Sequence, residues 1–148
     1  MSLVEVIIAS AIVLMLSLIF ISVNLNYYKS SETSLKTVKA TFLAEEGTEA
    51  VNFIKNQDWN NLGTVGTNYY LVWINGVWTA TTTKNYIDQV YERKYYTENV
   101  NRDSNSDIIL AGGTLDPNTR KLTVAVSWVD ASGTTTKAIS SYVFKPND

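Results

Sequence analysis

Cysteine and histidine are both absent from the 148 residues of this chain. Their absence excludes disulfide bonds, thiol chemistry and zinc sites built on cysteine or histidine ligands. The sequence also lacks a glycine-rich phosphate-binding loop and a compact pair of acidic residues on a recognisable scaffold. Because catalytic groups and cofactor sites are drawn largely from these elements, we expect a protein that is not an enzyme and that has no cofactor.

Charge is missing from one long stretch near the start of the chain. Residues 6–28 contain no Lys, Arg, Asp, Glu, Gly or Pro, and Glu5 is the one charged side chain in residues 1–28. About 20 mostly apolar residues are enough for a helix to span a bilayer, so this stretch predicts a transmembrane segment. A secretory signal would have a basic region before its apolar core, whereas the first basic residue here is Lys29. A plain membrane anchor is the simplest alternative.

Glu5 is the residue that a plain anchor does not need. A carboxylate inside hydrocarbon costs about 2.5–3.5 kcal/mol on insertion scales, so it should have a partner. The nearest positive group along the chain is the amino terminus at Met1. Glu5 either pairs with an amine or caps the first helical turn, where a negative charge complements the helix dipole.

Proline is also absent from residues 24–58, where Gly47 is the single glycine. We therefore predict one continuous helix over residues 2–56, apolar on all sides at first and amphipathic later. At 1.5 Å per residue it would be about 80 Å long, so its first half should protrude and its second half should pack on a sheet. The apolar positions expected to face that sheet are Leu35, Val38, Phe42, Leu43, Ala50, Val51 and Ile54.

The remaining sequence changes to the two-residue period of strands. Residues 68–74 and 77–83 are rich in aromatic and β-branched side chains, and the Asn75-Gly76 pair between them suits a tight hairpin turn. Residues 87–97 predict a third strand, and residues 98–107 predict a polar loop.

A second hairpin is predicted nearer the chain end. Residues 116–118 (Asp-Pro-Asn) predict a turn into a strand over residues 121–129, in which Leu122, Val124, Val126 and Trp128 share one face. Residues 130–133 then turn into a strand over residues 134–144. The expected fold class is α+β, with the amphipathic helix half on an antiparallel sheet of four or five strands. The domains would be residues 1–28 and a head of residues 29–148, in which helix 29–57 covers sheet 68–144.

One polar loop has alternating oxygen side chains at Asn101, Asp103, Asn105 and Asp107, as at the start of a calcium-binding loop. Its sixth position is Ser106 instead of glycine and its twelfth is Gly112 instead of glutamate, so we interpret it as a polar loop without metal. Tyrosine and tryptophan clusters in the predicted strands form either an adhesive surface or sheet packing, and packing is the commoner role. The basic pairs at 93–94 and 120–121 give only thin support for nucleic-acid binding.

The first nine residues, Met-Ser-Leu-Val-Glu-Val-Ile-Ile-Ala, resemble the mature N-terminus of type IV pilins and pseudopilins, which has a glutamate at its fifth position. The resemblance implies that a prepilin peptidase has cut after a glycine and that Met1 is N-methylated. We expect the chain to be already processed, because no basic leader or glycine precedes Met1. The long helix followed by an antiparallel sheet also resembles the family's architecture.

The resemblance implies roles for residues in the apolar helix. Glu5 of one subunit would neutralise the Met1 amine of a neighbour in the core of a helical filament. Small residues such as Ala9 and Ser17 either permit close helix approach or, for serine, bond to a carbonyl one turn back. The filament-core packing would come from Leu3, Val6, Ile7, Val13, Leu14, Leu16, Leu18 and Phe20.

Two departures from the family pattern concern the helix and the head. Many members have a helix-breaking glycine and proline where this chain has Leu14 and Ser22, and many close a C-terminal loop with a disulfide bond that this chain cannot form.

The expected function is a structural subunit of a type IV pilus, for adhesion, motility or DNA uptake. It would assemble with identical subunits, served by prepilin peptidase and the pilus assembly machinery. It would lie in the cytoplasmic membrane first and in an extracellular surface filament afterwards.

Two other functions stay open. One is a minor pilin or a pseudopilin of a type II secretion-like system. The other, outside the family, is a membrane-anchored extracellular binding module. A surface or host ligand is not identified by the sequence, and nucleic acid as a partner has no support beyond the two basic pairs.

Overall fold

The computed structural model describes residues 2–130 and 133–146. The chain forms two compact units, Met1–Thr37 and Val38–Asp148, and each is described by itself. One helix, α1 (Leu3–Gln57), contributes to both units. Its bounds confirm the continuous helix predicted over residues 2–56. The reason is local: the segment has no proline, and its one glycine is Gly47.

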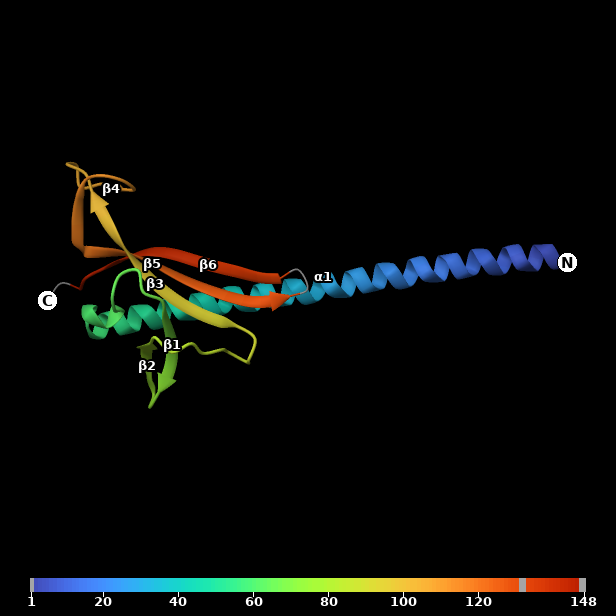
Figure 1. The fold of residues 1–148 in the computed structure, drawn as a ribbon, viewed down its shortest axis with the longest axis horizontal. Coiled ribbons are helices and arrows are strands. Elements are labelled where there is room, and N and C mark those ends of the chain that lie inside the picture. The colour runs from blue at the N-terminus through green and yellow to red at the C-terminus, as the bar shows by residue number, and fades with distance from the viewer. Residues whose placement is uncertain (1, 131–132, 147–148) are drawn as a thin grey trace. The chain divides into compact units, whose positions relative to one another are not determined.

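The second unit contains the last part of α1 and an antiparallel sheet (Figure 1). After α1, a short 3-10 helix, η1 (Trp59–Leu62), begins at Asp58, whose side chain accepts the Asn60 N–H at 2.8 Å. The sheet order is β2-β1-β3-β5-β6, and β4 pairs with β3. The strands are β1 (Tyr69–Ile74), β2 (Val77–Thr81), β3 (Glu92–Arg102), β4 (Ile108–Ile109), β5 (Thr114–Asp130) and β6 (Gly133–Phe144).

Both predicted hairpins are present. In the first, β1 pairs with β2, and Asn75 and Gly76 have φ values of 51° and 80°, as the tight turn requires. In the second, β5 pairs with β6 along twelve residue pairs. The predicted turn over residues 130–133 includes residues 131 and 132, which lie outside the described part of the chain. The α+β class and the antiparallel sheet packed by α1 are therefore confirmed, with β4 added to the four or five strands expected.

The third strand was predicted too early in the chain. Residues 87–91 instead form a tight loop, in which the Ile87 N–H donates to the Tyr91 carbonyl at 2.8 Å and the Tyr91 N–H donates to the Ile87 carbonyl at 3.0 Å. Strand β3 then runs to Arg102, so the predicted polar loop over residues 98–107 is wrong in its first half. Polar residues there occupy a strand because their backbones pair with β5, as in Glu98 opposite Lys121.

The predicted turn at residues 116–118 is also wrong, because these residues lie inside β5. The pairing register with β3 shifts at this point: Asn99 lies opposite Arg120, whereas Val100 lies opposite Asp116. Residues 117–119 are therefore extra residues of a bulge. A bulge is one of the few places where a sheet tolerates proline, which explains Pro117 inside a strand.

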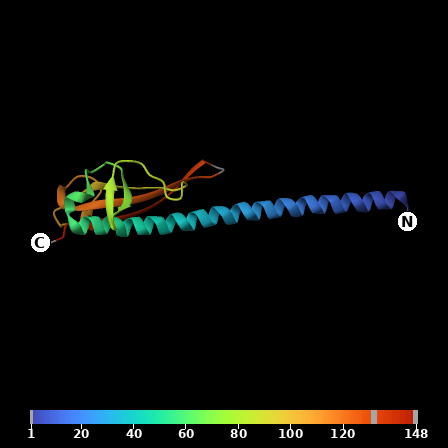
Figure 2. The same ribbon diagram turned by 90° about the horizontal axis from the view of Figure 1, so that it is seen from below.

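The core of the second unit lies between α1 and one face of the sheet. Leu122, Val124, Val126 and Trp128 are all buried, as the predicted shared face of β5 requires. On α1 the buried positions are small or β-branched: Ala40, Ala44, Gly47, Ala50, Val51 and Ile54. Seen from below, the sheet lies along one side of this part of the helix (Figure 2).

Three of the seven positions predicted for the sheet-facing stripe of α1 are wrong, and Leu43 is partly buried against the core. Leu35, Val38 and Phe42 are exposed, whereas Ala50, Val51 and Ile54 are buried as expected. The reason is close packing: a Cβ atom added at Gly47 would lie 2.8 Å from Cγ1 of Val124. A helix that approaches a sheet this closely presents its small residues to the sheet, and the large apolar residues then fall on its opposite side.

Candidate assembly surface

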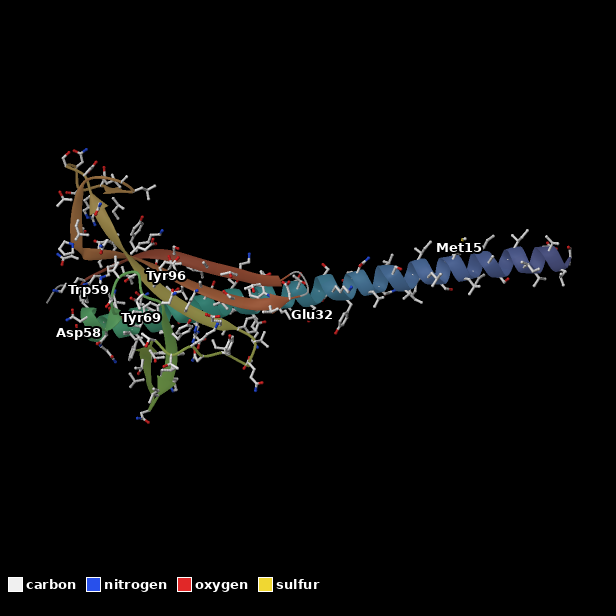
Figure 3. All side chains as sticks on the ribbon, viewed as in Figure 1. Met15, Glu32, Asp58, Trp59, Tyr69 and Tyr96 are labelled. Carbon is white, nitrogen blue, oxygen red and sulfur yellow. The ribbon has the colours of Figure 1, made fainter. Side chains whose placement is uncertain are left out.

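The described part of the first unit is a helix without protein cover, and its surface is mostly apolar as far as Leu25. Every residue from Ser2 to Leu35 is exposed, and the first part of α1 is long and apolar enough to cross a membrane by length and composition. Figure 3 shows side chains, including Met15, projecting from the helix in this part of the chain. Exposed apolar side chains in an unbroken series indicate contact with lipid or with another protein.

Glu5 lies in the first turn of α1 and takes part in its cap. Ser2 stands at the N-cap position, and its Oγ accepts the Val4 N–H at 3.3 Å. Oε2 of Glu5 accepts the Ser2 N–H at 3.4 Å. This is a variant of the capping box: the glutamate three residues later accepts the serine N–H, while the serine Oγ accepts the N–H of Val4 instead of Glu5. The capping role considered for Glu5 is therefore present in the single chain, while Met1, its proposed ionic partner, lies outside the described residues.

Polar side chains inside the apolar stretch are turned back onto the helix. Ser10 donates to the Ile7 carbonyl at 2.9 Å, Ser17 to the Val13 carbonyl at 2.8 Å, and Ser22 to the Leu18 carbonyl at 3.0 Å. The Asn24 amide does the same with the Phe20 carbonyl at 2.8 Å. These bonds occupy the donors, so the helix presents few unsatisfied polar groups to an apolar environment.

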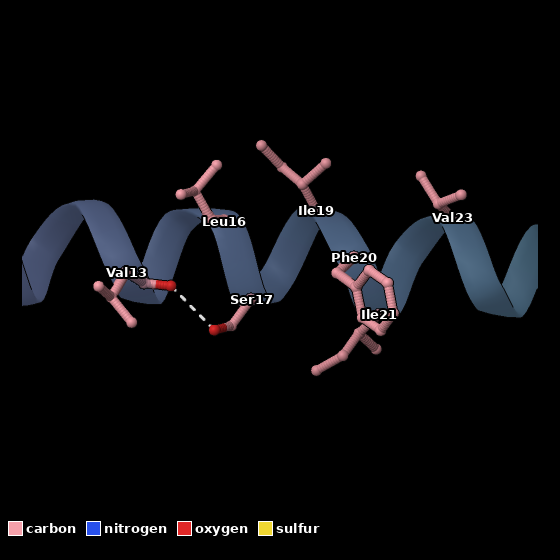
Figure 4. A pocket seen from close by; sticks show the side chains of 7 residues that line it. All are labelled: Val13, Leu16, Ser17, Ile19, Phe20, Ile21 and Val23. Atoms are coloured by element: carbon pink, nitrogen blue, oxygen red, sulfur yellow. Dashed lines mark hydrogen bonds between the residues drawn. The ribbon is translucent and has the colours of Figure 1, made fainter.

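Figure 4 shows the middle of this surface from close by, including the bond from Ser17 to Val13. Leu16, Ile19 and Val23 point to the same side of the helix. The side chains here line an open hollow of about 640 Å³ in which Ser17 is the one polar residue. An open apolar hollow on a single helix fits the side chains of another helix or the chains of lipids, and it offers no polar group that would orient a small ligand.

The predicted packing residues are spread around the whole helix and are not gathered into one face. All of them are exposed, namely Leu3, Val6, Ile7, Val13, Leu14, Leu16, Leu18 and Phe20. Equally exposed are Ile12, Met15, Ile19, Ile21 and Val23, which the prediction left out. Sequence reasoning also missed Ser2, although serine followed by glutamate three residues later is a recognisable capping signal.

Side chains of the oxygen-rich loop at residues 101–107 form hydrogen bonds that hold the loop in its conformation. Oδ1 of Asp103 accepts the N–H groups of Asn105 and Asp107 at 2.8 and 3.0 Å. The Asn101 amide donates to the Gly112 carbonyl at 2.8 Å. Oδ1 of Asp103 thus holds the turn, in which the backbone of Ser106 has a φ of 69°.

Aromatic residues of the sheet divide between core and surface. Tyr91 and Tyr95 are buried, and Tyr95 stacks on Tyr69 with ring centroids 5.6 Å apart. Trp73, at the end of the first hairpin, is 59% exposed. Packing therefore explains Tyr69, Tyr91 and Tyr95, whereas Trp73, Tyr86 and Tyr142 are exposed.

Several charged groups in the second unit form ion pairs within it. Burial raises the pKa of Glu92, but hydrogen bonds from Lys84 and Tyr70 outweigh burial and leave the pKa below its usual value. The pKa of Asp116 falls to about 2 because Thr119 and Arg102 donate hydrogen bonds to its carboxylate. These groups stabilise the head in their charged forms, and none of them is arranged around a substrate-sized cavity with a nucleophile.

Comparison of the chain with protein-family models, with curated proteins and with solved structures found no match.

Proposed function

We propose that this chain is the structural subunit of a type IV pilus-like filament, polymerising through residues 1–28 and carrying its sheet domain outward. The observation that supports the proposal is the exposed and mostly apolar surface from Leu3 to Leu25, on the same helix that packs on the sheet of the second unit. Before assembly this surface lies in the cytoplasmic membrane, and after assembly it lies among identical subunits at the bacterial cell surface.

The energetics of exposed apolar side chains support this use of the helix. Burial of one large apolar side chain contributes about 1.5–3 kcal/mol, so a stretch of this length has no stable place in water. Lipid tails provide cover, and so do other helices. Since lipid and leucine are equally apolar, the exchange of one for the other has little hydrophobic driving force, and specific contacts decide whether subunits associate.

Glu5 provides that specific contact in the proposal. In the single chain its carboxylate accepts one long hydrogen bond from Ser2, at 3.4 Å, which leaves most of its acceptor capacity unused. In a dry filament core, a carboxylate and an ammonium attract each other far more strongly than in water. Glu5 of an incoming subunit therefore pairs with the Met1 amine of a neighbour and sets the register of docking, while Met1 is the N-methylated end left by prepilin peptidase.

The test is the variant Glu5→Gln. Glutamine preserves the capping box but removes the charge, so capping and ion pairing are separated. We expect Glu5→Gln to enter the membrane as wild type does, with an unchanged melting temperature for the sheet domain, and to be missing from filaments sheared from cells. The matched control is Ser2→Ala, which loses the cap, at a cost of about 1 kcal/mol of helix stability, and still assembles. Filaments of normal number and length from Glu5→Gln would contradict the proposal.

The same preparation of sheared filaments distinguishes this function from the two alternatives, a minor pilin or pseudopilin and a membrane-anchored binding module. A subunit that forms the dominant band of sheared filaments is a major pilin, and a trace band indicates a minor pilin or a pseudopilin. Mass spectrometry of the N-terminus tests the binding-module alternative, because an unprocessed and unmethylated chain that stays in the membrane is an anchor. The chemistry proposed for this subunit is assembly alone, without catalysis or a cofactor.

A further inference from the structure

The second unit contains an open groove between α1 and the end of the first hairpin. Its walls include the rings of Phe53, Trp73 and Trp78, and its rim on α1 includes the carboxylates of Glu46 and Glu49. The groove has a volume of about 440 Å³, which falls within the range of small-molecule sites, about 300–1,000 Å³. We call this set of five residues the aromatic groove.

The two tryptophans of the aromatic groove form a corner. Trp73 and Trp78 are directly paired across β1 and β2, with ring centroids 5.1 Å apart and ring planes inclined at 72°. The turn at Asn75 and Gly76 closes the hairpin two residues beyond Trp73, so the backbone holds both rings in register. Trp73 is 59% exposed and Phe53 is 46% exposed, so both rings are accessible to a ligand.

One side of the groove already holds a cation. The Arg93 guanidinium lies 5.2 Å from the centre of the Trp78 ring, and its Nη1 donates to Oε2 of Glu46 at 2.6 Å. An aromatic face and a carboxylate together therefore bind a positive group at this place. Glu49, one helical turn after Glu46, forms no ion pair with any residue in the described part of the chain. Glu49 lines the groove together with the rings of Trp73 and Phe53, so a second carboxylate and further aromatic rings are available there.

We propose that the aromatic groove binds an organic cation with alkyl groups on its nitrogen, of the quaternary ammonium class to which choline belongs. Aromatic rings attract cations through their negative faces, and quaternary ammonium ligands are a characteristic occupant of aromatic sites. A bare ammonium is strongly hydrated and loses more on entering an apolar groove. An anion is disfavoured because Arg93 neutralises Glu46, which leaves the carboxylate of Glu49 as the net charge at the rim. The proposal does not rest on the filament function.

The experiment is calorimetric titration of the full chain in a maltoside detergent, with choline, tetramethylammonium and ammonium chloride as probes. We expect choline and tetramethylammonium to bind at least ten times more tightly than ammonium. Trp73→Ala should weaken choline binding at least tenfold, and Glu49→Gln should weaken it several-fold. Equal affinities for ammonium and tetramethylammonium would overturn the proposal.

The chain offers a matched control on the same helix. Phe42 is 65% exposed and lies outside the groove, so Phe42→Ala should leave choline binding unchanged while Phe53→Ala weakens it. Both residues are surface-exposed, and the melting temperature checks that both variants fold. Equal effects of the two substitutions would contradict the site.

Two further measurements separate the possible sources of the cation and the competing occupant. Phosphocholine that binds as tightly as choline indicates a headgroup displayed on a surface, whereas weaker binding indicates a free cation, since the carboxylate of Glu49 repels the phosphate. If no cation binds and Trp73→Ala instead removes the chain from filaments, the groove is a contact between copies and the proposal is wrong.

Discussion

The first and second parts of α1 have the same backbone and opposite surroundings. From Leu3 to Leu35 every side chain is exposed, whereas from Ala40 to Ile54 one stripe is buried against the sheet. The apolar residues of the first part are large, and the buried residues of the second part are mostly small. A helix that will meet lipid or other helices therefore needs bulk on all sides, while a helix that packs closely on a sheet needs one narrow stripe.

Polar side chains follow the same division. In the first part they bond to their own helix, as Ser17 does with the Val13 carbonyl. In the second part Thr48 does the same with the Ala44 carbonyl at 2.9 Å, but Lys39 reaches another element and pairs with Asp88 at 2.6 Å. The Arg93 guanidinium of β3 also donates to the Leu43 carbonyl of this part at 3.1 Å. Polar side chains that bond to their own helix suit a surface that contacts either lipid or other helices. Polar side chains bonded between elements stabilise one arrangement of those elements.

The largest expected effect is that of a charge in the first part. Leu14→Lys places an ammonium in the middle of the apolar stretch, at a cost of about 2.5–3.5 kcal/mol, which is about 100-fold in membrane insertion. The fraction of the chain that resists carbonate extraction from membranes measures insertion. Thr33→Lys, outside the apolar stretch on the same helix, should insert as wild type does. Equal insertion of the two variants would mean that the two parts of α1 do not differ in their tolerance of a charge.

The next largest effect is expected from the same valine-to-alanine substitution made in each of the two parts of α1. Val51 is fully buried against the sheet and Val23 is exposed. Val51→Ala should destabilise the sheet domain by about 2 kcal/mol, through lost contacts and a small cavity, and lower its melting temperature by on the order of 5–10 °C. Val23→Ala should leave the melting temperature of the chain in detergent unchanged. Thermal unfolding followed by near-ultraviolet circular dichroism checks both.

A smaller effect tests the close packing at Gly47. Gly47→Ala gains about 1 kcal/mol of helix propensity but places a Cβ atom against Val124, and overpacking costs about 1–3 kcal/mol. We expect a net loss of about 1 kcal/mol in denaturant unfolding. In a Val124→Ala background the same change should be neutral or stabilising, because the new methyl group then has room. A stabilised Gly47→Ala single variant would mean that the helix is not held this close to the sheet.

The smallest effect is a pH dependence confined to the second unit. The pKa of Asp116 is lowered from 3.8 to about 2 in the folded chain by hydrogen bonds from Thr119 and Arg102. A lowered pKa means that the carboxylate stabilises the fold above pH 4 and that this contribution is lost as the pH falls from 4 towards 2. The melting temperature should therefore fall more steeply over this range in wild type than in Asp116→Asn. Identical slopes would contradict the assignment.

The sequence predicted the elements whose signals are local. The continuous helix and the Asn75-Gly76 hairpin need only the absence of proline and the backbone freedom of two turn residues. Errors arose where pairing with a distant strand overrides local preference: residues 98–102 are polar but lie in β3, and Pro117 lies in a bulge of β5. No local sequence pattern predicts the strand at residues 98–102 or the bulge at Pro117.

The candidate assembly surface was almost fully readable from the sequence, because it consists of consecutive residues on a single helix. Its apolar character, its length and the position of Glu5 follow from residue order alone. The capping contact of Glu5 was one of two roles considered, and Ser2, its partner, was overlooked although it too is local. The aromatic groove was not predictable, since it joins Phe53 of α1 to Trp73 of β1 across a packing contact that the sequence does not encode locally.

The sequence by itself thus determined the class of the fold, the long helix and the apolar surface of its first part. Tertiary structure alone decided which face of the second part of α1 is buried. The helical period alone does not show whether the side of α1 that contains Phe42 or the side that contains Ala44 faces the sheet. The close approach of Val124 to Gly47 decides this, because only the side with small residues fits so near the sheet. The physical reason is that helical period and hydrophobicity are properties of neighbouring residues, whereas packing depends on the shape of the surface that the helix meets.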